Sequence, residues 1–375
     1  MSQSHRASIQ ECFSELTDPR RRKVVYPLVN IVTIAICAVL CGADDFVAIA
    51  EFGRAKRKWL SRFLDLSAGI PSHDRFNAIL GSLKVDEFQK CLLQFITALH
   101  EVTDGQVVAI DGKTLRRSFD RASSKSAIHM VSAWASANHI SLGQVVVDEK
   151  SNEITAIPKL LQMLEISGCL ITIDAMGCQT EIAQAIVDAK ADYVLTAKNN
   201  QPTLAKGISD FFVDHSEDDF ARVEVRRHIT DEKGHGRQEH REHFICRVPE
   251  QLPDCARWPK LVAIGMVFVS AIRNGVEHME CRHYILSKYL TAKQFAKAVR
   301  DHWSIENRLH WQLDVTFQED QSRIRKGNAD ANFSTLRRTA LSLLKNNHSK
   351  KVGVKNKRLL AALDDDYLLE VVFRH

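Results

Sequence analysis

The chain has 375 residues, of which 45% are hydrophobic and 26% are charged, so it is a globular protein with enough length for two or three domains. Its 51 lysines and arginines against 46 acidic residues give a formal charge of +5, which permits a polyanionic partner but does not require one. The nine cysteines form no CxxC pair, so the sequence indicates neither a zinc site nor a disulfide framework, and a reducing cytoplasm fits best.

Residues 1 to about 100 have the periodicity of helices, which we expect at 28–40, 47–63 and 85–99. The most apolar stretch, 31–41, is about half the roughly 20 residues that a membrane helix needs, so we expect a buried helix and no membrane span. The polar stretch 1–15 also lacks the layout of a signal peptide. We predict a separate helical, DNA-binding domain over 1–100, whose deletion should weaken binding to specific DNA ends more than it harms the fold of the core.

Two basic clusters lie in this N-terminal region. One runs from Arg20 to Lys23, and the other comprises Arg54, Lys56, Arg57 and Lys58. Either cluster could contact phosphate groups of a nucleic acid, and either could be no more than a solvated face.

From Gln106 the pattern changes to short β-branched runs separated by turns. The expected strands are 107–110, 129–135, 140–147, 169–173 and 193–197, with helices at 157–164 and 181–189. Three antiparallel strands followed by two helix–strand pairs is the order of an RNase H-like mixed sheet. We therefore predict an α/β fold, with an RNase H-like mixed sheet and flanking helices, over 105–345.

The region after the fifth strand departs from this alternation. A helix is expected at 204–215, and the stretch 221–286 is rich in strand signals, including 261–272 and the Asn274-Gly275 turn. We predict an inserted β-rich subdomain at about 220–287. Helices are then expected from 291 to about 317 and over 331–345, and 346–375 should hold a basic segment and a final helix near 361–373.

Two of the expected strands end in an aspartate. Asp111 follows the apolar run 107–110 and precedes Gly112 and Lys113, and Asp174 follows the run 169–173. An acid at the end of a buried strand costs free energy unless it is paired or binds a metal, although an aspartate can also simply open a turn. On neighbouring strands the two carboxylates would lie side by side, as a Mg²⁺ site requires.

A third carboxylate is expected on a helix that packs against these strands, and Glu306 is the best candidate. At 3.6 residues per turn, four mainly apolar positions lie within about 60° of it: Val299, His302, Leu309 and Leu313. We therefore expect Glu306 at the centre of a buried apolar face, where it needs a cation. The alternative is an acid neutralised by a nearby arginine or histidine.

Other acids nearby are weaker candidates for this role. Asp314 lies eight residues further along, roughly 80° around the helix axis. Glu319 and Asp320 follow the expected end of the helix, where Arg323 and Arg325 are ready ion-pair partners.

Short motifs are spread over nearly the whole chain. They are Pro71-Ser-His-Asp74, Asp111-Gly-Lys113, Asp174-Ala-Met-Gly-Cys-Gln179, Lys198-Asn-Asn-Gln201, His235-Gly-Arg-Gln-Glu-His-Arg241 and His302-Trp-Ser-Ile-Glu-Asn307. Together they resemble the H-repeat-associated family of DDE-type insertion-sequence transposases of bacteria. In related hairpin-forming transposases a helix motif carries Tyr, Arg and Lys where this chain has Val299, His302 and Leu313, so the chain departs from the hairpin-forming pattern.

The resemblance implies a transposase that cleaves DNA and transfers strands, with an RNase H-like core and two Mg²⁺ or Mn²⁺ ions about 3.5 to 4 Å apart. Carried over by position, Asp111, Asp174 and Glu306 become the catalytic and metal-binding triad. The implied partner is DNA, both element ends and target. We expect a homodimer assembled on DNA and a nucleoid-associated protein in the cytoplasm.

Five cations are expected to contact DNA phosphates: Lys113, Lys198, Arg237, Arg241 and Arg308. Arg237 and Arg241 alternate with Glu239 and should therefore project from one face of a strand. The alternative for this strand is a surface ion-pair ladder.

Three other functions remain open at this point. The chain could be an RNase H-like nuclease that does not transpose, or an inactive copy of an element, because excision and joining use the same triad. It could also be a DNA-binding protein without enzymatic activity, which would bind DNA in a salt-sensitive, metal-independent way.

Overall fold

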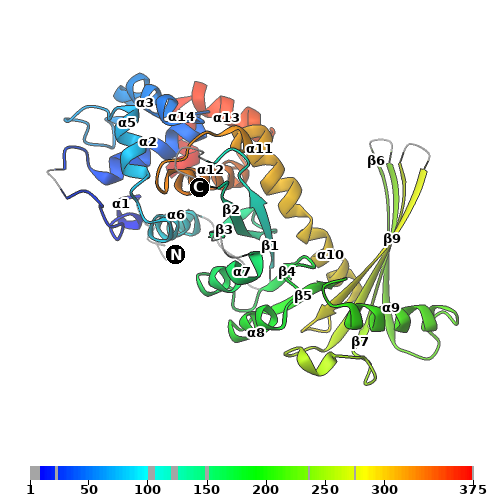
Figure 1. The fold of residues 1–375 in the computed structure, drawn as a ribbon. Helices are drawn as coiled ribbons and strands as arrows, with labels where there is room; N and C mark the ends of the chain where they lie inside the picture. The colour runs from blue at the N-terminus through cyan, green and yellow to red at the C-terminus, as the bar shows by residue number, and fades with distance from the viewer. Residues whose placement is uncertain are drawn as a thin grey trace, which may run out of the picture. The chain divides into compact units, whose positions relative to one another are not determined.

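A computed structural model describes residues 9–21, 24–99, 106–119, 126–147, 152–234, 237–273 and 276–373. The chain packs as two units (Figure 1). The first unit comprises Met1–Thr103, Gly112–Glu149 and Glu306–His375, and the second comprises Asp104–Asp111 and Lys150–Ile305. Across the described ranges, every helix is too short or too polar to span a membrane.

The second unit is built on a mixed sheet in the order β1-β4-β5-β9-β8-β7-β6. β1, β4 and β5 are parallel to one another, and every later neighbour pairs antiparallel. The strands are β1 (Val107–Thr114), β4 (Leu170–Ile173), β5 (Asp192–Ala197), β6 (Val225–Gly234), β7 (Arg237–Arg247), β8 (Ala263–Arg273) and β9 (Val276–Leu286). The mixed α/β class expected from the sequence is confirmed.

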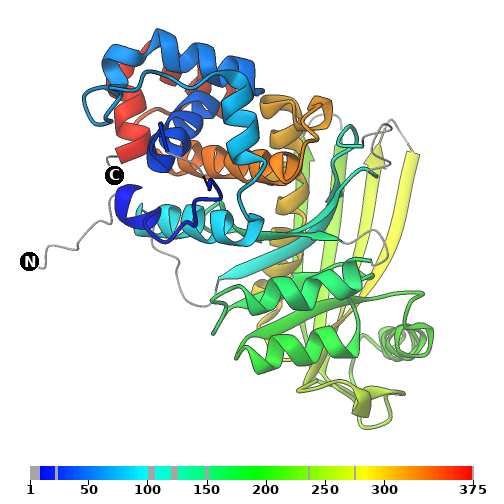
Figure 2. The ribbon, with the colours of Figure 1, turned by 60° about the vertical axis from the view of Figure 1, so that its left-hand side comes forward.

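Helices on this unit connect and cover the sheet: α7 (Glu153–Gln162), α8 (Thr180–Asp188), α9 (Pro202–Ser216) and α10 (Ala292–His302). Figure 2 shows α7 and α8 lying side by side along the sheet. α10 packs so closely on β8 that a Cβ at Gly265 would lie 2.6 Å from the ring of Phe295. Phe295 and Val299 of this helix pack in one hydrophobic core with Ile245 and Tyr284 of the sheet.

The region predicted as an inserted β-rich subdomain at about 220–287 is rich in strands, as expected. β6 to β9 form long hairpin-like pairs as expected, but β9 pairs antiparallel with β5 through Val194 opposite Leu286. The strands therefore extend the same sheet. The predicted Asn274-Gly275 turn lies outside the described residues.

The first unit contains the antiparallel strands β2 (His129–Ala135) and β3 (Ile140–Val147) in the order β3-β2-β1, with β1 contributing Gly112 to Thr114. The expected helix 47–63 is two helices. The helices of this unit are α1 (Ile9–Cys12), α2 (Leu28–Leu40), α3 (Phe46–Ala55), α4 (Arg57–Leu60), α5 (His73–Leu80), α6 (Val85–Leu99), α11 (Trp311–Phe317), α12 (Ala329–Asn346), α13 (Val354–Leu363) and α14 (Asp365–Phe373).

The N-terminal helices pack around α12, which comes from the C-terminal part of the chain. α12 contacts α2, α5 and α6, and its residues 329–344 are all buried, including the polar ones (Figures 1 and 2). The side-chain amide of Gln144 on β3 donates a hydrogen bond to the hydroxyl of Thr335 on α12 at 2.7 Å. The backbone N–H of Gln144 donates to the side-chain oxygen of Gln89 on α6 at 3.0 Å. Residues 1–100 thus pack in one unit with α12, and their removal would uncover this helix.

Two basic residues of the expected C-terminal basic segment are buried. Lys357 of α13 donates to the carbonyl of Leu344 at 2.9 Å, close to the last turn of α12. Arg358 donates to the carbonyl of Val39 at 3.1 Å, near the end of α2. Cations at the C-terminal ends of helices satisfy carbonyls that have no partner within the helix. These two side chains therefore stabilise helix ends.

Candidate active site

Asp111 and Asp174 lie on adjacent parallel strands. Ile110 of β1 is opposite Ile173, the last residue of β4, so Asp111 follows within β1 and Asp174 follows directly after β4. Neighbouring strands are about 4.8 Å apart, which places the two acids side by side at one edge of the sheet. The predicted adjacency of the two strands is confirmed, whereas a carboxylate separation short enough to share a metal stays a prediction. β1 continues to Thr114, so Asp111 is within the strand rather than at its end.

The turn after β4 orients the carboxylate of Asp174. Its Oδ1 accepts hydrogen bonds from the backbone N–H groups of Met176 at 3.1 Å and Gly177 at 3.3 Å. A side chain at Gly177 would place a Cβ 2.2 Å from Ile173, so the turn can fold this tightly only with glycine there. Asp111 and Asp174 are both half-buried, and their hard oxygen atoms are the ligands that Mg²⁺ prefers.

Glu306 does not have the environment that the sequence predicted. It begins a π-helical turn, Glu306–His310, between α10 and α11, and it is exposed. Hydrogen bonds from residue i to i+5 widen such a turn, so the side-chain directions expected at 3.6 residues per turn do not apply. Leu309 and Leu313 are fully buried as expected, but the prediction of a buried Glu306 is wrong.

The structure does not bring the three acids together within one unit. Asp111 and Asp174 belong to the second unit, and Glu306 belongs to the first. In the ranges that the structure describes, no group of three or more His, Cys, Asp or Glu side chains has an arrangement that could hold a metal ion. The triad of Asp111, Asp174 and Glu306 stays a prediction.

His302 ends α10 in the second unit and packs against β4. Its Nδ1 lies 3.2 Å from Oγ1 of Thr172, two residues before Asp174. Burial lowers the pKa of His302 to about 4, and the nearby charge of Asp174 only partly opposes this effect. The imidazole is therefore neutral at pH 7.

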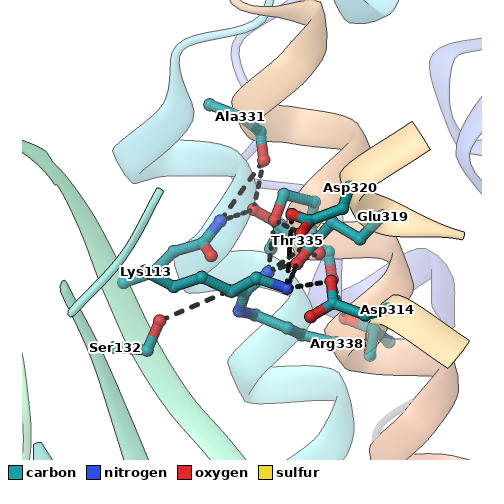
Figure 3. Close-up of polar contacts among 11 residues, drawn as sticks. Lys113, Ser132, Asp314, Glu319, Asp320, Ala331, Thr335 and Arg338 are labelled. Carbon is teal, nitrogen blue, oxygen red and sulfur yellow. Dashed lines mark hydrogen bonds and ion pairs between the residues drawn. The ribbon is translucent and has the colours of Figure 1, made fainter. Parts of the chain in front are cut away.

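Lys113 is the centre of a buried ionic cluster in the first unit (Figure 3). Its side chain is only 9% exposed, and its ammonium group contacts the carboxylates of Asp314, Glu319 at 3.2 Å and Asp320 at 3.9 Å. Glu319 in turn pairs with Arg338 at 3.0 Å. We call these five residues the ionic cluster.

Neighbouring cations and a hydroxyl group stabilise the ionised form of Glu319. The carboxyl group is completely buried, which alone would raise its pKa, but Arg338, Lys113 and Arg337 together with the Ser334 hydroxyl lower the pKa to about 2. The sequence predicted Arg323 and Arg325 as partners of Glu319 and Asp320. That prediction is wrong for Glu319, because its partners come from β1 and α12 instead.

One sequence signal could have indicated this cluster. Ser334 and Arg338 lie one helical turn apart in α12, and Phe333, Leu336 and Leu341 of the same helix are apolar residues of the kind that become buried. A cation on a buried helix requires an anionic partner, although the sequence does not say which one.

The other cations expected to contact DNA differ in exposure. Lys198 follows β5 directly and is exposed, and Arg308 is exposed with its Nη1 3.1 Å from Nε2 of His139. Arg241 is 19% exposed and pairs with Glu239 and, at 3.4 Å, with Glu232. The ion-pair alternative therefore applies to Arg241. The side chain of Arg237 and the turn at His235 lie outside the described residues.

An open groove of about 700 Å³ lies beside α3 and α4 in the first unit, and Arg54, Arg57, Lys58, Ser61 and Ser67 are among its lining residues. Lys56, expected in the same basic cluster, instead pairs with Asp365 at 2.6 Å. Within the first cluster, Arg20 pairs with Asp18 at 2.5 Å, whereas Arg22 and Lys23 lie outside the described residues. Arg54, Arg57 and Lys58 of the second basic cluster therefore line one open groove.

Comparison with known proteins accounts for most of the chain. A family model described as Transposase DDE domain matches residues 102–343, and one described as DDE_Tnp_1-associated matches residues 10–96. Putative transposase YncI of Escherichia coli O157:H7 is 41% identical over 370 residues, which cover 97% of this chain and 94% of that protein.

Two further relatives come from Escherichia coli strain K12. H repeat-associated putative transposase YhhI is 39% identical over 370 residues, covering 97% of each chain. Inactive transposase YbfQ is 35% identical over 63 residues, covering 17% of this chain and 75% of that protein. The near-complete coverage and the two matching models show that the chain belongs to the H repeat-associated family of DDE-domain transposases.

Proposed function

We propose that this chain cleaves DNA at the ends of an insertion sequence and joins those ends to a target, with a metal-dependent site built from Asp111, Asp174 and Glu306. The observation that carries the proposal is the register of β1 and β4, in which the two aspartates follow paired residues of one sheet. Membership of a transposase family supports DNA as the substrate.

The strand order supports an RNase H-like core for this site. The order is β3-β2-β1 in the first unit and β1-β4-β5 in the second, with the first three strands preceding two helix–strand connections in the chain. This is the order expected from the sequence for such a core. In an open sheet of this kind the ends of parallel strands are where ligands bind.

The oxygen donors of the proposed triad are of the chemical kind that divalent ions prefer. Met176 and Gly177 orient Oδ1 of Asp174 by their N–H groups, so Oδ2 is the oxygen available to a cation. Asp111 supplies a second carboxylate beside it, and the exposed Glu306 supplies the third. When bound, two Mg²⁺ or Mn²⁺ ions supply the activation of the attacking oxygen and the stabilisation of the leaving oxygen in a phosphodiester reaction.

DNA contacts are proposed at exposed cations rather than buried ones. Lys198 lies at the end of β5, next to the strand that carries Asp174, and Arg308 follows Glu306 by two residues. The groove lined by Arg54, Arg57 and Lys58 is the proposed contact of the N-terminal region with the element ends. Neutralising phosphates releases counterions, so these contacts should make binding strongly dependent on salt. We further propose that two copies assemble on DNA.

The first experiment is incubation of the protein with DNA that contains the flanks of its own gene. With Mg²⁺ we expect cuts at discrete positions at both ends, and with EDTA we expect bound but uncut DNA. Cuts at random positions would instead support a nuclease that does not transpose. Salt-sensitive binding without any cut in Mg²⁺ or Mn²⁺ would support an inactive copy, as the name of the relative YbfQ states for that protein, or a non-enzymatic DNA-binding protein.

A further inference from the structure

β6 forms one border of the sheet in the second unit (Figure 1). The strand, Val225–Gly234, pairs with β7 along its whole length. In the described ranges, no strand pairs with its other side. An edge strand presents a row of backbone N–H and C=O groups, to which another chain can bind by adding a strand. The side chains of β6 indicate which chain fits there.

The charges of β6 are arranged symmetrically about Ile229. Arg226 and Arg227 lie before it, and Asp231 and Glu232 lie at the same distances after it. If two copies of β6 pair antiparallel with Ile229 at the centre, Arg227 faces Asp231 of the other copy, and Arg226 faces Glu232 of the other copy. Charged side chains on an edge usually prevent pairing, but opposite charges at facing positions stabilise it. The edge therefore matches a second copy of itself.

Neighbouring registers lack this match. A two-fold symmetric antiparallel pair places one residue opposite its own copy, because facing side chains lie on the same side of the sheet. A pair centred on Thr230 would set Arg227 opposite Lys233, and one centred on Asp231 would set two aspartates opposite each other. Like charges at facing positions are destabilising. The sequence of β6 thus favours the register centred on Ile229.

The inner residues of this pattern are accessible. Alternate residues share one face of a strand, so Arg227, Ile229 and Asp231 lie on the same face of β6. Ile229 is 43% exposed despite its apolar side chain, and Asp231 is 74% exposed. α10 contacts the opposite face, where Arg300 binds Glu232 at 2.5 Å. In the symmetric pair, the two Ile229 side chains would lie side by side, flanked by an ion pair at each end.

Contacts within the chain leave capacity for these ion pairs. Arg227 binds Glu242 through Nε at 2.9 Å and through Nη2, whereas its Nη1 is 3.7 Å from the exposed Asp219. Oδ1 of Asp231 lies 2.7 Å from Nδ1 of His240, and its Oδ2 has no partner among the described residues. A guanidinium group has five N–H donors, so Arg227 can bind a second carboxylate without releasing the first.

We propose that β6 is a dimerisation edge, at which two copies of this chain pair antiparallel with Ile229 at the two-fold axis, so that the sheet of one copy continues into the other. A two-fold contact uses the same surface on both copies, which the symmetric charges of β6 supply. DNA does not fit this edge, because the exposed Asp231 repels phosphate groups. The inference goes beyond the proposed function, since this dimer requires neither DNA nor metal ions.

The test is sedimentation equilibrium of the full chain without DNA, for which we expect a reversible equilibrium of monomer and dimer. Arg227→Glu sets two acids opposite each other at both ends of the contact, and Asp231→Arg sets two arginines there. Each variant alone should therefore dimerise at least about tenfold more weakly than wild type. A mixture of the two variants should form mixed dimers with about wild-type affinity, because every facing position then pairs an acid with an arginine.

A substitution at the axis does not disturb the ion pairs within the chain. Ile229→Lys places two ammonium groups opposite each other, so it should also weaken the dimer at least about tenfold. The matched control is Met279→Lys, the same substitution at an exposed apolar position of β9 in the same unit, which should dimerise like wild type. Circular dichroism of each variant shows that it is folded at the temperature of the measurement.

A wild-type chain that stays monomeric without DNA up to its limit of solubility would overturn the inference. Dimers that withstand Ile229→Lys, or that Met279→Lys weakens equally, would show that the contact lies elsewhere. Folded Arg227→Glu and Asp231→Arg variants that do not associate when mixed would show that these residues do not face each other. All of these outcomes are independent of whether the protein cuts DNA.

Discussion

Replacement of Glu319 by glutamine measures how strongly the ionic cluster stabilises the first unit. Glu319 is completely buried, and its carboxylate is bonded to Arg338 at 3.0 Å, Lys113 at 3.2 Å and the Ser334 hydroxyl at 2.7 Å. Glutamine keeps the shape of the side chain but leaves buried cations without their anion. Breaking a buried ion pair from one side costs about 3 to 5 kcal/mol, and we expect the free energy of unfolding to fall by that amount at pH 7.

The pH dependence of this loss has a definite sign. The pKa of Glu319 is about 2 in the folded protein against an ordinary value of 4.5. Because the folded value is the lower one, the stabilisation is fully present above about pH 4.5 and is lost as the pH falls towards 2. The difference between the two values corresponds to about 3 kcal/mol, in agreement with the loss expected on substitution.

Hydrogen exchange of the α12 amides is the suitable assay, because it reports on the first unit alone. The control is Glu15→Gln, which removes an exposed acid 3.6 Å from Lys90 and should change stability by about 0 to 1 kcal/mol. The difference in free energy of unfolding between wild type and Glu319→Gln should decrease from pH 6 to pH 3. Two results would refute this account of the cluster: an equal loss of unfolding free energy in Glu319→Gln and Glu15→Gln, or a difference between wild type and Glu319→Gln that stays constant down to pH 3.

Three other outcomes are expected. Glu306→Gln should abolish Mg²⁺-dependent cleavage but keep DNA binding and the melting temperature, because the side chain is exposed; cleavage at the wild-type rate would remove Glu306 from the triad. Deletion of residues 1–100 should give an aggregating or protease-sensitive product, because α12 loses its contacts with α2 and α6, and a folded truncated protein would contradict this. Arg57→Ala combined with Lys58→Ala should reduce the salt slope of DNA binding by about 2, and an unchanged slope would show that the groove does not contact phosphates.

Local patterns predicted many individual elements. The helices 28–40 and 85–99 and the strands 129–135 and 140–147 have the expected bounds, because apolar periodicity is a property of neighbouring residues. The pairing of β9 with β5 joins residues about 90 positions apart, such as Val194 and Leu286, and no local pattern specifies it. The sequence therefore predicted a β-rich insertion but not that its strands extend the sheet of β1, β4 and β5.

In the candidate site, too, some features were predictable from the sequence and others were not. The adjacency of Asp111 and Asp174 was predictable, because the ends of neighbouring parallel strands lie at the same edge of a sheet. The exposure of Glu306 was not, since a π-helical turn alters the directions that a regular helix would give. The partners of Lys113 lie 201 and 206 residues further along the chain, so its burial in an ionic cluster could not be read from its neighbours.

The central claim is that Asp111 and Asp174, side by side on β1 and after β4, belong to the site that cleaves DNA, and Asp174→Asn tests it most directly. The matched control is Asp188→Asn, an equal loss of charge at an exposed position of α8 in the same unit. Single-turnover cleavage of DNA carrying the element ends is measured in Mg²⁺ with both variants at saturating concentration. Metal ions contribute several kcal/mol to such reactions and about 1.36 kcal/mol is tenfold in rate, so Asp174→Asn should slow cleavage by at least about a thousandfold while Asp188→Asn cuts like wild type. Cleavage by Asp174→Asn at the wild-type rate would contradict the account.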